Sequence, residues 1–381
     1  MKIIFNRLDM MNAITPLLCA VGGKSTFTSV NCILFEVTAP NICTLTSYDL
    51  EKGVRISVNV EVEEEGSYAI EANKFYQTLK LFDGDEISLT VAKNRAVTLE
   101  CGSSVFSMTA IEGEDFPEIP RLTSDNEFSL RQSVLKNMLG KVLFSMAVND
   151  NRPFLNGAHM KIEGQRMTLV SCDSFRLSKI SANVEILDQS GASQDVNIQY
   201  VIPNKTVNEL YRQLSDREES TVQVITTKKN IIFNLNGYTF FSKLIDSQYM
   251  DYDRMIIKNH TIHITVDKEM LCSALDRASI VTEEKIAGTN HAFVKLTAEG
   301  DTLKISAISD VSSLNDAVPI EKEGNDLTIS FNNKYLQEVI RSCDGEKVRI
   351  SMTGKLLGIN VEPAESDMEQ ICMILPVRTP D

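Results

Sequence analysis

The feature that most constrains the fold of this chain is an internal repeat. Three short apolar stretches are each followed by an Asn-Lys pair, and these pairs begin at Asn73, Asn204 and Asn333. Their spacings of 131 and 129 residues are close to one third of the 381-residue chain. Repetition at a fixed period indicates that one structural unit is built several times, so we expect three similar domains.

A second motif recurs with nearly the same period. TLTSYDLEKGVRI, TLVSCDSFRLSKI and, more faintly, LKISAISDVSSLNDAVPI follow a common frame in which Asp49, Asp173 and Asp310 correspond. After its aspartate the middle copy reads SFRL, which neither of the other copies has. The difference raises the question of what the middle copy does that the others do not.

The spacing of apolar residues assigns the same elements to each repeat. A short alternating strand is followed by a helix, a second helix begins at the Asn-Lys pair, and the remainder alternates as strands do. Ser133 and Asp267 precede helical runs and suit the N-cap position. We therefore predict an α+β fold of three repeated domains, each with two helices packed on antiparallel sheets, at residues 1–122, 123–257 and 258–381.

Composition and cysteine usage are those of an intracellular folded protein. Apolar residues make up 43% and charged residues 24% of the chain. The eight cysteines never form a CxxC pair and most have apolar neighbours, so we expect buried free thiols rather than disulfides or metal ligands. No stretch resembles a signal peptide or a membrane span, and the cytoplasm is the expected location.

The sequence predicts no metal site, no cofactor and no catalytic residue. His260 and His263 stand three apart in an alternating segment, which would place them on opposite faces of a strand. The segment GGKS lacks the first glycine of a phosphate-binding loop, because Leu18 occupies that position. Neither GxSxG nor HExxH is present. We therefore expect a protein that is not an enzyme.

The charge distribution matters more than the net charge of −14, which alone argues against nucleic-acid binding. Lys205 and Arg212 would share one face of a helix, and Lys334 and Arg341 repeat the arrangement in the third repeat. For a single helix, a solvated charged face is the simpler explanation. Its recurrence on corresponding helices indicates a basic surface that attracts phosphates without reading bases.

Stretches along the whole chain carry a family resemblance. They read MKIIFNRLDMMNAITPLLCAVGGKST, EDFPEIP, FSMAVNDNRPFLNG, SCDSFRL, FSKLIDSQYMDYDRM and MILPVR. In this order they resemble the bacterial sliding clamp, the beta subunit of DNA polymerase III. The resemblance implies a non-catalytic processivity factor that forms a head-to-tail homodimer, a ring of six domains around duplex DNA.

The resemblance also implies weak, sequence-independent contacts between the inner surface of the ring and double-stranded DNA. The matching positions are Lys24, Asn73, Lys74, Lys80, Asn149, Arg152, Lys205 and Arg212. It places Phe106 and Met108 at the dimer interface, against Ile280 and Val281 of the second copy. From their apolar character alone, these four residues are equally well explained as core residues.

In the family, the middle copy of the motif forms part of an apolar cleft between the second and third domains. The replicative polymerase, the clamp loader and repair proteins insert a short peptide there, with a glutamine, leucines and an aromatic residue. Where the family commonly has glycine, histidine and proline, this chain has Ser174, Phe175 and Met250. The positions that match the cleft are Leu155, Cys172, Ser174, Phe175, Arg176, Leu177, Met250, Arg254, Met255, Asn332, Tyr335, Leu356, Gly358, Met373, Ile374, Leu375, Pro376, Val377 and Arg378.

Two further expectations follow for this motif. Replacing Arg176 and Leu177 together by alanine should weaken peptide binding and leave the ring intact. Apart from the family, SCDSFRL is typical of a strand end and a turn with a solvated arginine.

An alternative of a different class is a repeat-built protein-interaction scaffold that never encloses DNA. Salt-sensitive, sequence-independent association with circular DNA distinguishes the clamp from such a scaffold.

Overall fold

The computed structural model describes residues 1–23, 28–120, 124–282 and 293–378. By its internal contacts the chain divides into two structural units, each assembled from several segments. The first unit comprises Met1–Gln132, Leu187–Ala192 and Arg212–Leu244; the second unit comprises Ser133–Ile186, Ser193–Tyr211 and Ile245–Asp381.

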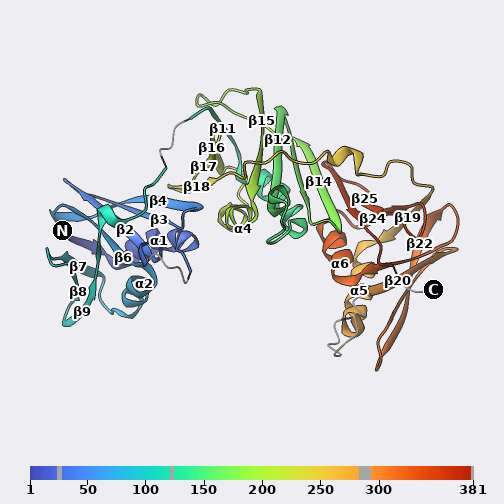
Figure 1. Ribbon diagram of the computed structural model, residues 1–381, viewed down its shortest axis with the longest axis horizontal. Helices are drawn as coiled ribbons and strands as arrows, with labels where there is room; N and C mark the ends of the chain where they lie inside the picture. The colour runs from blue at the N-terminus through green and yellow to red at the C-terminus, as the bar shows by residue number, and fades with distance from the viewer. Residues whose placement is uncertain (24–27, 121–123, 283–292, 379–381) are drawn as a thin grey trace. The chain divides into compact units, whose positions relative to one another are not determined.

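The first unit is built on antiparallel sheets that carry helices α1 and α2 (Figure 1). One sheet has the order β5-β1-β7-β8-β9 and the other the order β10-β6-β2-β3-β4-β18-β17-β16-β11. The elements are β1 (Lys2–Asn6), α1 (Arg7–Leu17), β2 (Cys32–Thr38), β3 (Ile42–Tyr48), β4 (Lys52–Asn59), β5 (Glu61–Glu64), β6 (Gly66–Glu71), α2 (Ala72–Leu81), β7 (Glu86–Val91), β8 (Ala96–Cys101), β9 (Ser104–Thr109), β10 (Ile111–Glu112), β11 (Asn126–Arg131), β16 (Thr221–Thr226), β17 (Asn230–Leu235) and β18 (Tyr238–Lys243).

The second unit is built on a 12-stranded antiparallel sheet with the order β15-β12-β13-β14-β26-β25-β24-β19-β22-β21-β20-β23. Helices α5 and α6 pack against each other and against this sheet. The elements are α3 (Gln132–Gly140), β12 (Gly157–Gly164), β13 (Arg166–Cys172), β14 (Arg176–Asn183), β15 (Val196–Pro203), α4 (Asn204–Gln213), β19 (Ile262–Asp267), α5 (Lys268–Thr282), β20 (Phe293–Glu299), β21 (Thr302–Ile308), β22 (Ser313–Glu323), β23 (Leu327–Asn332), α6 (Asn333–Ser342), β24 (Lys347–Met352), β25 (Ile359–Pro363) and β26 (Glu369–Ile374). The first residue of α3 and the last two of α4 belong to the first unit.

The helices begin where the repeat predicts. A strand runs directly into a helix six times among the described residues, twice in each third of the chain, which confirms the predicted pair of helices per repeat. Asp267 is the expected N-cap of α5, because its Oδ1 accepts a hydrogen bond from the backbone N–H of Met270 at 2.8 Å. Ser133 is not a cap: it is the second residue of α3.

Strand pairing runs across both predicted domain seams. β18 of the second predicted domain pairs with β4 of the first, and β14 of the second pairs with β26 of the third. An unpaired edge strand exposes backbone donors and acceptors, and pairing with a neighbouring domain satisfies them. The two structural units therefore do not coincide with the three sequence repeats.

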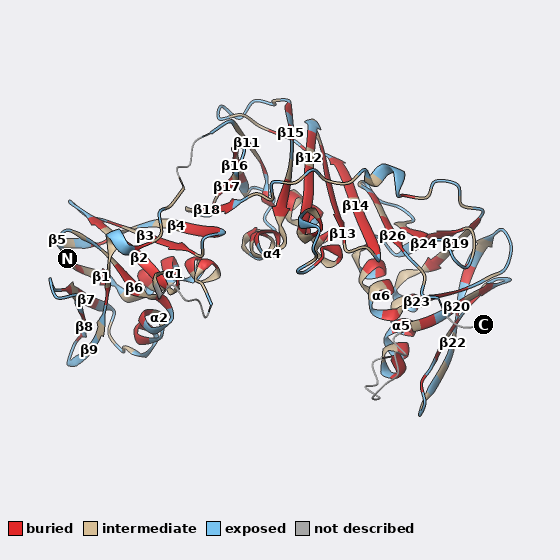
Figure 2. Ribbon diagram, in the orientation of Figure 1, coloured by how far each residue is buried: buried red, intermediate tan, exposed pale blue. Residues whose placement is uncertain are grey.

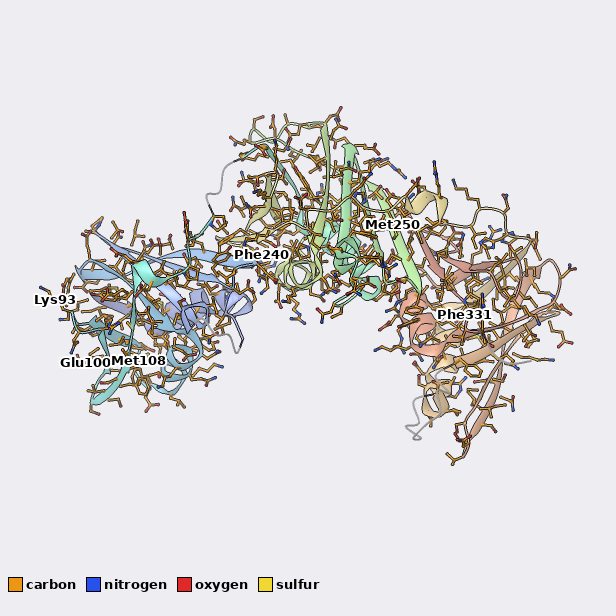
Figure 3. All side chains as sticks on the ribbon, viewed as in Figure 1. Lys93, Glu100, Met108, Phe240, Met250 and Phe331 are labelled. Atoms are coloured by element: carbon orange, nitrogen blue, oxygen red, sulfur yellow. The ribbon has the colours of Figure 1, made fainter. Side chains whose placement is uncertain are left out.

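Buried residues follow the strands and the helix faces that meet them (Figure 2). In the second unit the core lies between the sheet and helices α5 and α6 and includes Phe331, Leu336 and Val339. Burying a large apolar side chain of this kind stabilises the folded chain by roughly 1.5–3 kcal/mol. Phe240 and Phe331, labelled in Figure 3, are fully buried in the first and second units.

All eight cysteines are free thiols, and only Cys19 and Cys272 are partly accessible. Burial raises the pKa of Cys32 to about 11, which keeps this thiol protonated and unreactive at neutral pH. Within the described residues no helix is both long and apolar enough to cross a membrane.

Candidate functional site

The repeated motif folds into the same turn in its first two copies. The backbone N–H of Asp49 donates to the carbonyl of Lys52 at 3.1 Å, and that of Asp173 donates to the carbonyl of Arg176 at 3.2 Å. In return each aspartate Oδ1 accepts the N–H groups two and three residues further on, at 2.8–3.0 Å. The aspartates therefore replace backbone partners in a tight turn between two strands.

The third copy has the same turn with a different first residue. Ser309 N–H donates to the carbonyl of Ser312 at 2.9 Å, and Ser309 Oγ accepts the N–H groups of Val311 and Ser312. The counterpart of Asp49 and Asp173 is thus Ser309, and the predicted equivalence of Asp310 is wrong by one residue. A hydroxyl fills the same role because it accepts the same two N–H groups.

The second residue of the turn adopts a left-handed backbone in the first two copies, with φ 77° at Leu50 and 78° at Ser174. Glycine reaches this conformation without steric cost, whereas other residues rarely adopt it. This explains why a glycine suits the position of Ser174 in the family that the sequence resembles. The third residue, Phe175, projects into solvent with 58% of its surface exposed.

Arg176 is buried, contrary to the expected solvated arginine. Only 6% of the residue is exposed. Its Nε donates to Asp173 Oδ2 at 3.0 Å, Nη1 donates to Glu338, and Nη2 donates to the carbonyl of Phe144. Its guanidinium carbon lies 4.2 Å from the centre of the Tyr335 ring. Arg176 therefore ties β14 to α6 beneath the surface.

The residues expected to form the apolar cleft separate into a floor and a rim. The floor is one buried cluster that contains Leu155, Cys172, Leu177 and Met373, and Met250, labelled in Figure 3, packs against it. Gly358 is also buried, whereas Ile374 is buried in the core against α5 and α6 and does not belong to this cluster. Because Leu177 is fully buried, replacing it with alanine would leave a cavity in the floor, so Leu177, like Arg176, cannot be removed without structural cost.

The rim consists of exposed or half-buried side chains, most of them apolar. The N–H of Leu375 donates to the carbonyl of Phe175 at 2.8 Å, and the Phe175 ring lies 6.0 Å from that of Tyr335. Gly358 lies against Leu375: a Cβ placed there would be 3.3 Å from the Leu375 side chain. The other expected rim residues are Leu356, Met255, Val377, Arg254 and Arg378, all exposed, and Ser174, Pro376 and Asn332, which are half-buried.

Polar contacts hold the segments of the rim in place. Asn332 Oδ1 accepts the N–H of Tyr335 and so caps α6. The N–H of Val377 donates to the carbonyl of Ser330, which fixes the C-terminal segment against β23. An apolar floor with an exposed apolar rim is the arrangement by which proteins capture short peptides.

Tyr249 and Tyr252, which no sequence motif indicated, pack against the floor cluster. The rings of His159 and Tyr249 are stacked, with centroids 4.8 Å apart, and Tyr252 lies 5.8 Å from His159. Tyr249 Oη donates to the carbonyl of Val170 at 3.3 Å. Alternation along β12 places His159 on the polar face with Lys161 and Glu163, so no local pattern predicts its burial, which comes with the packing of Tyr249 and Tyr252.

Protonation of His159 should destabilise the second unit in acid. Burial lowers the pKa of this imidazole from 6.5 to about 4. The unfolded chain takes up the proton near pH 6.5 and the folded chain only near pH 4, so stability is lost as the pH falls below 6.5. We expect the free energy of unfolding to fall by about 2 kcal/mol between about pH 7.5 and pH 5 because of this group.

Chemical denaturation across this pH range, followed by tyrosine fluorescence, measures the effect. His159→Gln should lose this part of the pH dependence. Identical pH profiles for the variant and the parent would contradict the assignment.

The predicted DNA-contacting residues of the first unit lie on α2. Asn73 and Lys74 are exposed in its first turn, where the side chain of Glu71 accepts both of their N–H groups. Lys80 is exposed in the last turn, and its Nζ lies 4.6 Å from the centre of the Tyr76 ring. Lys24 lies outside the described residues.

The other predicted DNA contacts lie on two separate segments. Lys205 and Arg212 are exposed near the two ends of α4, seven residues apart as predicted. Asn149 is exposed with φ 58°. Arg152 pairs with Asp150 at 2.9 Å and donates to Ser174 Oγ, which places it at the middle copy of the repeated turn.

The predicted dimer-interface residues differ in exposure. Phe106 and Met108 are half-buried on β9, an edge strand; Met108 is labelled in Figure 3. Ile280 is 73% exposed in the last turn of α5. Val281 is 5% exposed and belongs to the core of the second unit, so it is a core residue within its own chain.

Comparison with known proteins places the whole chain in one family. Models of the DNA polymerase III beta subunit match residues 1–120 for the N-terminal domain, 129–251 for the central domain and 253–378 for the C-terminal domain. A beta sliding clamp of Halalkalibacterium halodurans is 30% identical over 88% of this chain and 86% of its own. One of Proteus mirabilis is 29% identical over 99% of this chain and 100% of its own. The crystal structure of the Pseudomonas aeruginosa DNA polymerase III beta subunit is 25% identical, with a TM-score of 0.89 and full coverage of both chains.

A chain of three similar domains, each with two helices on antiparallel sheets, has the fold of a DNA clamp. The relatives and the solved structure agree with that class and do not favour a scaffold that never encloses DNA. This chain belongs to the family of bacterial beta sliding clamps, the beta subunits of DNA polymerase III. The family is that of a replication processivity factor.

Proposed function

We propose that two copies of this chain close head to tail into a ring around duplex DNA. The observation that carries the proposal is a pair of different unpaired strand edges. Within the described residues, β9 pairs only with β8, and residues 313–319 of β22 pair only with β21. Because the two edges belong to different surfaces, their contact is heterologous, and such contacts form a closed ring when the rotation between copies completes a circle.

Apolar residues beside these edges support the same contact. Phe106 and Met108 lie on β9, and Ile280 is exposed on α5, the helix that packs against β22. Exposed apolar side chains beside an unpaired strand are the usual composition of a homodimer interface. The limits 1–122, 123–257 and 258–381 remain our proposal for the three domains of each copy.

Inside the ring, exposed basic residues would hold DNA by its phosphates. Lys74, Lys80, Lys205 and Arg212 are all exposed on helices. Such contacts are independent of sequence and weaken with salt, and a closed ring needs no tight contact to stay on DNA. The acidic net charge of −14 then limits the binding of unloaded rings. Asn73, Asn149, Arg152 and the undescribed Lys24 complete the proposed set.

The cleft beside the middle repeated turn would dock the partners. Its buried floor and exposed rim fit a short apolar peptide, and Met250, Met255 and Met373 allow the surface to adapt to several sequences. Through it the ring would tether DNA polymerase III and receive the clamp loader and repair proteins in the bacterial cytoplasm. The chain would carry out no chemistry and need no cofactor, and the loader would supply the energy for loading.

Release from linear DNA tests the ring directly. Rings loaded on a nicked circular plasmid should stay bound in high salt and be lost as soon as the plasmid is linearised, because only topology holds them. Gel filtration of the labelled protein before and after cutting measures the retention. Equal loss from circular and linear DNA would contradict encirclement, and a failure to associate even with the clamp loader and ATP present would favour the scaffold.

A further inference from the structure

A polar pocket with a volume of about 500 Å³ opens on the surface of the second unit. Five strands contribute to it: β14, β19, β24, β25 and β26. The segment that follows the short 3-10 helix Tyr252–Arg254 forms its remaining wall through Ile256, Ile257 and Lys258.

The pocket adjoins the floor of the cleft. Leu177 of the floor and Lys179 of the pocket stand two residues apart on β14, so they share one face at a separation of about 7 Å. Asn360 of the pocket pairs directly with Met373 of the floor across β25 and β26. Ile256 belongs both to the pocket wall and to the floor cluster.

The segment of residues 250–258 serves both sites. Met250 packs on the cleft floor, Met255 is exposed beside it, and Ile256 to Lys258 face the pocket. A chain that lies in the cleft therefore passes within one or two residues of the pocket. Continuity with the cleft distinguishes this pocket from an isolated surface depression.

Two polar groups at the base of the pocket lack a normal partner. Asn360 is 5% exposed; its Nδ2 donates to the carbonyl of Ile257 at 2.7 Å, but within the described residues its Oδ1 accepts no hydrogen bond. His260 Nε2 is also buried without a hydrogen-bond partner among the described residues. Burial lowers the pKa of this imidazole, and the nearby Asn360 side chain partly opposes that shift. Buried polar atoms of this kind normally have a partner, so a ligand that supplies one would be favoured.

Both histidines line the pocket, which corrects the expectation of opposite strand faces. β19 begins only at Ile262, so His260 precedes the strand and the alternation does not apply to it. His263 bonds Ser351 Oγ through Nδ1 at 2.9 Å. Among the described residues no group of three His, Cys, Asp or Glu side chains could hold a metal ion.

The charges of the pocket favour a monoanion. Lys179, Lys258 and Arg349 face Asp253 and Glu362, which gives a formal charge of 3 − 2 = +1 in a chain of net charge −14. Lys179 is paired with Asp253 at 2.6 Å, whereas Lys258 and Arg349 form no ion pair within the described residues. A dianionic phosphate would meet more repulsion from the two carboxylates than a carboxylate would.

We propose that this pocket is a second binding site that takes an acidic side chain of the peptide docked in the cleft. Lys258 and Arg349 would bind the carboxylate, and Asn360 Oδ1 would accept a backbone N–H of the peptide, which a free anion does not have. The inference rests on the proposed function of the cleft. Partners with an acidic residue beside their apolar motif would bind more tightly than partners without one.

Fluorescence anisotropy with three kinds of labelled peptide tests the proposal. The parent peptide carries glutamine, leucines and an aromatic residue; the second kind adds glutamates, at either end in separate peptides; the third adds glutamines instead. At low salt the glutamates at one end should raise affinity about three- to tenfold, and the glutamines should not. The gain should disappear in Lys258→Ala/Arg349→Gln and persist in Lys243→Ala, an exposed lysine outside the pocket.

The outcomes separate this site from the cleft. Both sites are supported if the peptide without glutamates binds the unmodified protein and the double variant equally, while the added glutamates raise affinity only for the unmodified protein. The pocket proposal is overturned, and the cleft proposal is not, if the added glutamates still raise affinity for the double variant. The same holds if glutamates at neither end of the peptide raise affinity. If the parent peptide does not bind at all, the cleft proposal fails, and titration with the monoanion butyrate tests the pocket by itself: shifts of the methyl resonances of Ile256, Ile257 and Ile371 support it, and their absence overturns it.

Discussion

Replacing Arg176 with alanine should lower the free energy of unfolding of the second unit by about 3–5 kcal/mol. The substitution removes a buried positive charge and leaves its hydrogen-bond acceptors without a donor. The side chain of Asp173 is only 13% exposed, and Glu338 and the carbonyl of Phe144 would also lose their donor. The Tyr335 ring would lose the guanidinium stacked on it.

Urea denaturation, with the slope compared between variants, measures this loss. Arg176→Lys should fall between parent and alanine variant, because an ammonium keeps the charge, but its three donors sit on one nitrogen and cannot span the partners that Nε, Nη1 and Nη2 of the guanidinium reach separately. Lys179→Ala is the matched control, since Lys179 also forms an ion pair from β14 but at the surface. A loss below about 1 kcal/mol, the range of exposed ion pairs, would show that the buried network does not support the turn.

Introducing a charge at Ile280 should weaken the dimer about 30- to 100-fold, because a carboxylate would have to be desolvated within an apolar contact. Ile280 is exposed in the single chain, so Ile280→Asp should leave the fold of the chain unchanged. Val281→Asp, one residue further, should instead unfold the second unit, because Val281 lies in its core. Ile280→Asp is thus expected to give a folded monomer, and Val281→Asp an unfolded second unit.

Sedimentation over a range of protein concentrations measures the dissociation constant of Ile280→Asp. Val148→Asp provides the control, since Val148 is equally exposed but belongs to none of β9, α5 and β22, the elements of the proposed interface. Monomers that appear at the same concentration for parent and Ile280→Asp would place the interface elsewhere.

Local sequence patterns predicted the parts of this structure that depend on near neighbours. The helices, the cap at Asp267 and the aspartate turns all rest on contacts within a few residues. Helical spacing also places Val281 in the core, in line with Leu271, Ala274 and Ala278 on one face of α5.

Local patterns could not predict contacts between residues that are far apart in the sequence. The sequence around Arg176 predicts a solvated side chain, because its partner Glu338 lies 162 residues away. The pairing of β4 with β18 and of β14 with β26 crosses the repeat boundaries, and no period in the sequence marks it. The third turn was misassigned because a serine hydroxyl replaces the carboxylate at a position shifted by one residue.

The repeated turn also has an evolutionary consequence. Its third residue points outward in every copy, as Glu51, Phe175 and Val311, while the first residue alone holds the backbone. One position of an otherwise fixed loop can therefore mutate without risk to folding. If the cleft docks partners as proposed, a change of Phe175 alone would alter which partners a clamp recruits while leaving the turn that carries it unchanged.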